Sequence, residues 1–306
     1  MTRDHSTRVV YAALAGNVLV ALSKFGAAFI SGSSAMLTEA IHSTADTANQ
    51  VLLLIGTWRS RARADASHVF GYGMEVYFWT FVVAVIVLLA GGVASIWQGA
   101  MQIDAPEEIK SPLVSLAVLG VSALFEATSF AVGYREYKRM VCGRTYHGRP
   151  VSMWRFIKIS KDPNLYETLL EDSAALIGIG IAALGVAASV YLHALWADGV
   201  ASIAIGLLLI ADSLVIANAT RSLISGESMA PSALADVRRE LKEIAGPVQV
   251  SETRTLHLGP KTVLVALTVT REGAASAVEL ERSLKEIEDR VRAVDARIRF
   301  VYFRFD

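Results

Sequence analysis

An apolar stretch with one polar side, AMLTEAIHSTADTANQVLLLIGTW (residues 35–58), determines the fold class expected for this chain. Its polar residues follow one another at steps of three, four and three, which on an α-helix form a single stripe: Glu39, His42, Asp46 and Asn49. Its 24 residues, at ~1.5 Å rise each, match a bilayer core of roughly 30 Å. An aspartate inside a membrane span costs about 2.5–3.5 kcal/mol on insertion scales. His42 and Asp46 therefore need partners elsewhere in the chain.

The composition predicts a polytopic membrane protein with a soluble part. Of the 306 residues, 53% are hydrophobic and 19% charged, and the mean hydropathy is +0.44. The net charge is zero, so the composition gives no electrostatic case for nucleic acid as a partner. The one cysteine, Cys142, excludes an intramolecular disulfide and any multi-cysteine zinc site. Residues 1–8 are polar and lead into a long span without a small-residue cleavage site, so we expect no removable signal peptide.

The lengths and periodicities of the apolar stretches predict six transmembrane helices, at about residues 9–30, 35–58, 76–99, 113–134, 165–192 and 195–217. The connections at 60–75 and 135–164 are rich in arginine and lysine, whereas those on the opposite side carry a single lysine, Lys110. Basic loops stay on the cytoplasmic side. We therefore expect an integral protein of a bacterial-type inner membrane, with both termini cytoplasmic.

The fifth span supplies a partner for the stripe. Asp172 lies nine residues after Pro163, and Asp46 lies 12 residues before Trp58. These separations correspond to depths of roughly 14 and 18 Å from the same face of the membrane. Two carboxylates and the His42 imidazole at one depth, on two helices, predict a cation site. Small residues beside them would let the two backbones approach closely.

Other ionisable residues in the spans have two interpretations each. Lys24 either reaches the interface while its stem packs, or pairs with Glu39. Glu126 serves ion traffic or interhelical bonding. Asp198 and Asp212 lie near the ends of the sixth span, where solvated or capping carboxylates are the favoured interpretation.

The chain after the last span predicts a soluble domain. Residues 1–222 form the transmembrane domain and residues 223–306 a cytoplasmic one of about 80 residues. Its periodicities predict helices at 232–244 and 277–294 and strands at 248–258, 263–270 and 298–305. The order αββαβ predicts a small α+β domain, consistent with a ferredoxin-like arrangement that lacks its first strand.

In combination these features resemble the cation diffusion facilitator family. The resemblance rests on His42-x-x-x-Asp46, an acidic fifth span that reads Leu-Glu-Asp at 170–172, the segment 67–75 (SHVFGYGME), Asn17 and Lys24 in the first span, and the αββαβ domain. It implies a homodimeric, proton-coupled exporter of divalent transition metals, commonly zinc. The implied metal site is His42, Asp46 and Asp172.

The fifth span departs from the family pattern. One turn before Asp172, where relatives often have His or Asp, this chain has Thr168, a poor zinc ligand. Glu171 is adjacent to Asp172 but turned by ~100° on the helix, so the sequence leaves open whether Glu171 or Thr168 faces the site. Glu171, Asn49 or water then completes a four-coordinate ion. Such an oxygen-rich set also suits Mn²⁺, Fe²⁺ or Co²⁺.

Two further family metal sites are not expected here. The loop site would need a second histidine where Tyr72 stands, which leaves Asp65 and His68 too few ligands. The terminal domain has a lone histidine, His257. We expect that domain to be a dimerisation module.

The sequence therefore predicts a proton-coupled antiporter of divalent metal, most simply zinc, that works by alternating access. Metal and protons would compete for the same groups, and His42 ordinarily titrates near neutral pH. We expect no enzyme and no prosthetic group. The alternatives are the same fold exporting Mn²⁺, Fe²⁺ or Co²⁺, and a non-transporting membrane scaffold with a buried polar cluster.

Overall fold

The computed structural model describes residues 2–141, 145–146, 149–150, 152, 163–244, 247–271, 273 and 276–306. The chain forms two compact units. The helical unit consists of Met1–Ile55, Trp79–Gly143 and Asn164–Asn218. The C-terminal unit consists of Gly56–Phe78, Arg144–Pro163 and Ala219–Asp306. The second unit therefore takes in the connection that follows the polar-striped helix.

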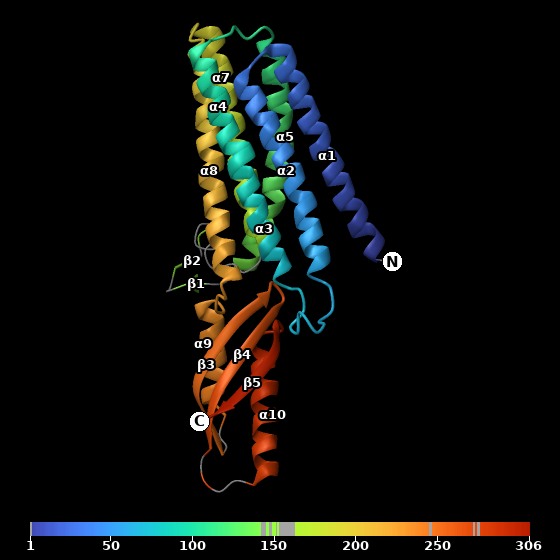
Figure 1. The fold of residues 1–306 in the computed structure, drawn as a ribbon, viewed down its shortest axis with the longest axis vertical. Coiled ribbons are helices and arrows are strands. Elements are labelled where there is room, and N and C mark those ends of the chain that lie inside the picture. Colours follow the sequence, from blue (N-terminus) through green and yellow to red (C-terminus); the bar gives the residue numbers. More distant parts are fainter. Residues whose placement is uncertain are drawn as a thin grey trace. The chain divides into compact units, whose positions relative to one another are not determined.

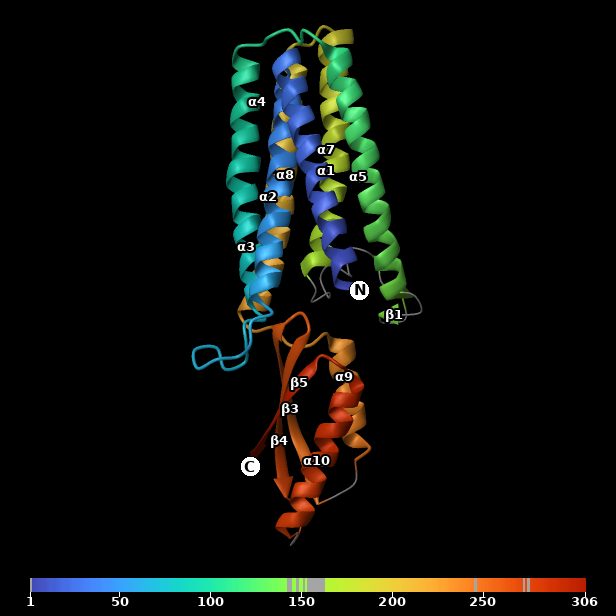
Figure 2. The same cartoon turned by 90° about the vertical axis from the view of Figure 1, so that its right-hand side faces the viewer.

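Long helices run side by side in the helical unit (Figures 1 and 2). They are α1 (Thr2–Ser31), α2 (Ser34–Arg59), α3 (Glu75–Ile86) continued by a π-helical segment (Val87–Val93) and α4 (Ala94–Asp104), α5 (Pro112–Val141), α7 (Pro163–Tyr191) and α8 (Trp196–Ile224). Five of them are long and apolar enough to cross a membrane, in the ranges Leu14–Ser31, Glu75–Asp104, Pro112–Arg139, Tyr166–Tyr191 and Trp196–Ile224. The fold is thus of the helical membrane type. Helix α2 is not among the five because its polar stripe lowers its hydropathy.

Glycines bring α4 and α8 together backbone to backbone. An ideal Cβ on Gly99 would lie 2.5 Å from the carbonyl oxygen of Gly199, and one on Gly199 would lie 2.7 Å from that of Gly99. Seven residues away on each helix the contact repeats, since a Cβ on Gly206 would lie 2.8 Å from the carbonyl oxygen of Gly92. Gly92 belongs to the π-helical segment. Small residues at a helix interface allow this close approach.

A buried carboxylate ties the start of α2 to α8. Asp198 is fully buried and accepts hydrogen bonds from Ser33 Oγ at 2.6 Å, Ser34 N at 2.6 Å and Ala35 N at 3.3 Å. Anions are favoured at a helix N-terminus, where backbone N–H groups lack partners within the helix. Of the two interpretations of Asp198 from the sequence, capping is right and solvation is wrong. The helix that Asp198 caps is a different one, α2.

Replacing Asp198 with alanine should destabilise the helical unit by about 1–3 kcal/mol, because buried N–H and O–H donors at the start of α2 would lose their acceptor. Thermal unfolding in detergent measures the effect. Asp104→Ala is the matched control, since Asp104 is exposed at the end of α4. Equal melting temperatures for the two variants would contradict the capping role.

The helices and strands that the sequence predicts after the last span are confirmed in the C-terminal unit. They are α9 (Pro231–Lys242), β3 (Val248–Gly259), β4 (Thr262–Arg271), α10 (Ala277–Val294) and β5 (Ile298–Phe305). The sheet order is β3-β4-β5, with β3 antiparallel and β5 parallel to β4. Figure 2 shows α9 and α10 covering one face of this sheet. The core between them includes alternate residues of β4, namely Val263, Val265, Leu267 and Val269.

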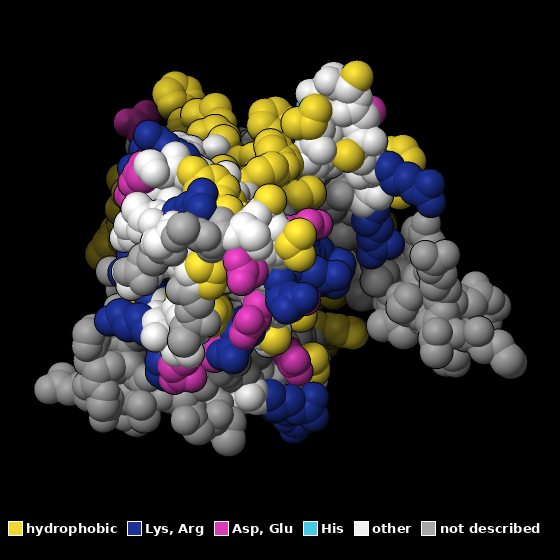
Figure 3. Space-filling model, turned by 90° about the horizontal axis from the view of Figure 1, so that it is seen from below, with side chains coloured by type: hydrophobic (Ala, Val, Ile, Leu, Met, Phe, Trp, Pro, Cys, Tyr) yellow, Lys and Arg dark blue, Asp and Glu magenta, His cyan; other side chains and the backbone are white. Residues whose placement is uncertain are grey.

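Charges of both signs mix on the surface of the C-terminal unit (Figure 3). Exposed or half-exposed ion pairs on α9 and α10 join Arg239 to Asp236, Arg290 to Glu240 and Arg292 to Glu288. Such pairs contribute little to stability. Their mixed sign gives this surface no general attraction for a polyanion, in line with the zero net charge of the chain.

The connection between α2 and α3 is organised around Asp65. Its carboxylate accepts hydrogen bonds from the Tyr72 hydroxyl at 2.7 Å and from the backbone N–H groups of Ser67 at 2.9 Å and His68 at 2.7 Å. These bonds, that of Tyr72 foremost, lower the pKa of Asp65 below its ordinary value. The bonds therefore stabilise the loop fully at any pH above the ordinary pKa of an aspartate. They are lost only as the pH falls through the lowered pKa of Asp65.

The same connection packs on the sheet of its own unit. The ring of Phe70 meets those of Phe300 and Tyr302 on β5 edge to face, with centroids 5.3 and 6.3 Å apart. Gly73 lies so close to Leu258 and Gly259 that a Cβ there would overlap the β3 backbone. His257 next to them is fully buried, and its backbone N–H donates to the carbonyl oxygen of Glu227.

Candidate metal centre

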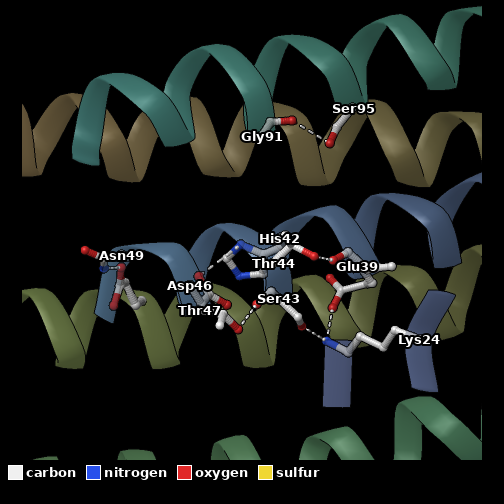
Figure 4. A network of polar contacts seen from close by, with 12 residues as sticks. Lys24, Glu39, His42, Ser43, Thr44, Asp46, Thr47, Asn49, Gly91 and Ser95 are labelled. Carbon is white, nitrogen blue, oxygen red and sulfur yellow. Dashed lines mark hydrogen bonds and ion pairs between the residues drawn. The ribbon is translucent and has the colours of Figure 1, made fainter. Parts of the chain in front are cut away.

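The polar stripe of α2 is turned into the helical unit. His42 is 2% exposed, and its Nδ1 lies 3.6 Å from Oδ1 of Asp46, one turn further along the helix (Figure 4). Neither ring nitrogen of His42 has a hydrogen-bond partner among the described residues. A buried imidazole with free nitrogens beside a carboxylate can act as a metal ligand.

Helix α7 places glutamates beside the C-terminal end of this stripe, where Asn49 lies. The side-chain amide of Asn49, which is 1% exposed, donates to Oε1 of Glu171. Glu167 is fully buried one turn before Glu171, and neither of its carboxylate oxygens has a hydrogen-bond partner among the described residues. Thr168 lies instead beside Gly133 of α5, whose ideal Cβ would be 4.0 Å from its methyl group. Of the two residues that the sequence left open, Glu171 has a hydrogen bond to α2.

Asp172 is turned toward α5. It is 8% exposed, it hydrogen-bonds Ser129, and the charges of Glu126 and Asp46 act on it. The charge of Asp46 also acts on Glu171. Asp46 is therefore within electrostatic reach of both adjacent acidic residues of α7.

Two acidic residues near the stripe were not among the candidates from the sequence. Asp212 of α8 is half-buried, and its carboxylate is within electrostatic reach of His42 and Asp46. Glu167 is the other. The spacing Glu167-x-x-x-Glu171 repeats that of His42-x-x-x-Asp46, and this repeat was the signal in the sequence that could have found it.

The candidate metal ligands of α2 and α7 lie near one another but do not converge on a single metal position. Among the described residues, no three His, Cys, Asp or Glu side chains lie close enough together to hold a metal ion. The chemistry of the set, one imidazole with several carboxylates and an amide, fits a divalent cation.

A buried ion pair lies one turn before His42. Lys24 of α1 donates to Oε2 of Glu39 at 2.9 Å and to Oγ of Ser43 at 2.8 Å, and both charged side chains are fully buried (Figure 4). Of the two interpretations of Lys24 from the sequence, pairing with Glu39 is confirmed.

Comparison with known proteins identifies the family. Residues 10–224 match the family described as the cation efflux transmembrane domain. The chain belongs to the cation diffusion facilitators. It is an integral membrane protein, as its apolar helices and this family indicate.

Three proteins show what this cation diffusion facilitator is similar to. Metal tolerance protein C4 of Arabidopsis thaliana is 30% identical over 259 residues, which are 84% of this chain and 55% of that protein. The human mitochondrial proton-coupled zinc antiporter SLC30A9 is 28% identical over 253 residues, 82% of this chain and 44% of that protein. The zinc transporter ZitB of Yersinia pestis is 26% identical over 123 residues, 40% of this chain and 39% of that protein. The chain spans about half the length of the first two.

Proposed function

We propose that this chain exports divalent transition-metal cations, zinc foremost, in exchange for protons. The observation that carries the proposal is the buried pair His42 and Asp46, with free imidazole nitrogens, facing acidic residues of α7 in a member of the cation efflux family. Relatives named as zinc transporters support zinc as the first ion to test.

The proposed ligands are His42, Asp46, Asp172, Glu171 and Asn49. An imidazole with two or three carboxylates satisfies a four-coordinate Zn²⁺, and Asn49 or water can take a remaining place. The transported ion is a substrate here, so the site must both bind and release it. Because metal-binding carboxylates and imidazole are deprotonated, ion and protons exclude one another from the same groups. Alternating exposure of that site to the two sides gives exchange.

The proposed architecture has six spans, with α2 as the second. A partner-lined polar stripe makes the crossing of α2 tolerable, since ionisable residues in spans face the bundle interior. Basic residues at 60–75 and 135–164 support cytoplasmic termini and an inner membrane of bacterial type. We further propose a transmembrane domain at 1–222 and, at 223–306, a cytoplasmic ferredoxin-like domain that joins two chains into a homodimer.

Two alternatives remain distinct from zinc export. Carboxylate and amide oxygens outnumber the nitrogen ligands of the site, which suits Mn²⁺, Fe²⁺ or Co²⁺ as the exported ion. A non-transporting scaffold would use the same residues only as a buried polar network.

Flux measurements separate these proposals. We expect purified protein in proteoliposomes to take up Zn²⁺ faster when the vesicle lumen is more acidic than the outside, because protons then leave as Zn²⁺ enters. An ionophore that collapses the proton gradient should abolish this stimulation. The same assay with Mn²⁺, Fe²⁺ and Co²⁺ gives the preference among ions. The exposed-site variant Asp104→Asn serves as the matched control. Absence of uptake for all four ions would favour the scaffold.

A further inference from the structure

The ion pair of Lys24 and Glu39 is unusual in being complete and dry. Both side chains have no exposed surface, and Nζ of Lys24 has two partners, Oε2 of Glu39 at 2.9 Å and Oγ of Ser43 at 2.8 Å. Burying two charges costs about as much as their attraction returns, and well-packed apolar residues are often as stable. Stability alone therefore does not account for charges at this place.

The pair lies next to the proposed metal site. Glu39 precedes His42 by three residues on α2, so the two side chains share the polar stripe. The charges of Lys24 and Glu39 both act on His42, and that of Lys24 also acts on Asp46. In the proposed topology Glu39 lies on the outer side of His42, on the route by which an exported ion would leave.

One oxygen of Glu39 is left for another ligand. Oε2 is held by Lys24, while Oε1 has no hydrogen-bond partner among the described residues. Oε1 lies against Gly178 of α7, where an ideal Cβ would be 2.5 Å from it. A glycine at this position leaves room for the carboxylate between α2 and α7. Buried polar atoms are normally bonded, so a free carboxylate oxygen here calls for a function.

We propose that Glu39 is a second cation-binding carboxylate, on the outer side of His42, and that the Lys24 ammonium occupies it while no metal is there. This inference rests on the proposed transport function. A metal ion that moves outward from His42 and Asp46 displaces Nζ of Lys24 from Glu39, and Ser43 Oγ remains as the partner of the displaced ammonium. When the ion has left, Lys24 returns and closes the carboxylate to re-entry.

Titration of full-length protein with Zn²⁺ in detergent tests the proposal. In Lys24→Gln the carboxylate of Glu39 is no longer neutralised, and we expect either a second Zn²⁺ per chain or an affinity at least about tenfold higher. Adding Glu39→Gln to this variant should remove the gain. Lys110→Gln is the matched control, because Lys110 is exposed outside the spans, and it should bind as the wild type does.

Each outcome decides. Wild-type stoichiometry and affinity in folded Lys24→Gln would overturn the proposal. If Lys24→Gln does not fold, Lys24→Met/Glu39→Met replaces the pair by apolar side chains of similar length, a kind of change that proteins often tolerate. There we expect one bound Zn²⁺ but slower outward flux in vesicles, whereas wild-type flux would show that the pair is only structural. Loss of all binding in Asp46→Ala tests the main site separately, so failure of one assignment does not mimic failure of the other.

Discussion

Replacing Asp46 with alanine should abolish Zn²⁺ binding and transport, with affinity falling by more than about 100-fold, while the protein stays folded. Asp46 lies 3.6 Å from His42 and interacts electrostatically with Glu171 and Asp172, so its loss removes a group common to these three proposed ligands. Asp172→Ala should have a similar effect. Calorimetric titration with Zn²⁺, run beside thermal unfolding, measures binding and folding in the same samples.

The control for Asp46→Ala is Asp104→Ala, which removes an exposed carboxylate at the last residue of α4. Wild-type affinity in folded Asp172→Ala would show that Asp172 serves the bundle through Ser129 and not the metal. Glu171→Ala is then decisive, because Glu171 accepts a hydrogen bond from the Asn49 amide of α2. A strong loss there makes Glu171 a ligand, and a mild loss leaves its place to water or Asn49.

Replacing Gly99 with valine should destabilise the helical unit by at least about 3 kcal/mol. The new Cβ would lie 2.5 Å from the carbonyl oxygen of Gly199, and the obstacle is backbone that cannot rotate away. Overpacking of a side chain can be relieved by a rotamer change, but here α4 and α8 must separate along their length. Yield and melting temperature in detergent measure the result.

The matched control is Gly120→Val in α5, another glycine of a membrane-type helix, whose Cβ would meet nothing within 4 Å. Gly199→Val, which approaches the same contact from the other side, should be as damaging as Gly99→Val. Equal melting temperatures for Gly99→Val and Gly120→Val would show that the contact between α4 and α8 does not stabilise the unit.

The periodicity of apolar and polar residues predicted the helices and strands, because these depend on residues that are close in sequence. The one-sided polarity of 35–58 identified a helix with an inward stripe, because residues three or four apart share a face whatever surrounds them. Alternation over 263–270 identified β4, whose alternate residues are buried. The end of α10 at Val294 was found because its apolar face stops there.

Orientation about a helix axis depends instead on tertiary packing. Adjacent residues such as Glu171 and Asp172 differ by ~100° in direction, and only packing decides which of them meets α2. The nearness of Asp212 to His42 was not predicted for the same reason, since the depth of Asp212 along α8 does not tell which helix it faces. The partner of Asp198 lies 164 residues away at Ser34, beyond the reach of any local pattern. Hydropathy alone also misses α2, because the polar residues that interest us make it less apolar.

The contact of Phe70 with β5 shows that the C-terminal unit includes residues from outside the C-terminal sequence. Residues 229–306 look detachable in the sequence, since they contain every element of the sheet and both of its helices. The C-terminal unit nevertheless includes Gly56–Phe78 as well as Ala219–Asp306, so no single cut releases it whole. A fragment from Met229 would leave Phe300 and Tyr302 bare on an edge strand, the kind of surface through which sheets join and aggregate. The sheet can therefore be moved intact into another protein only together with the connection between α2 and α3 that packs on it.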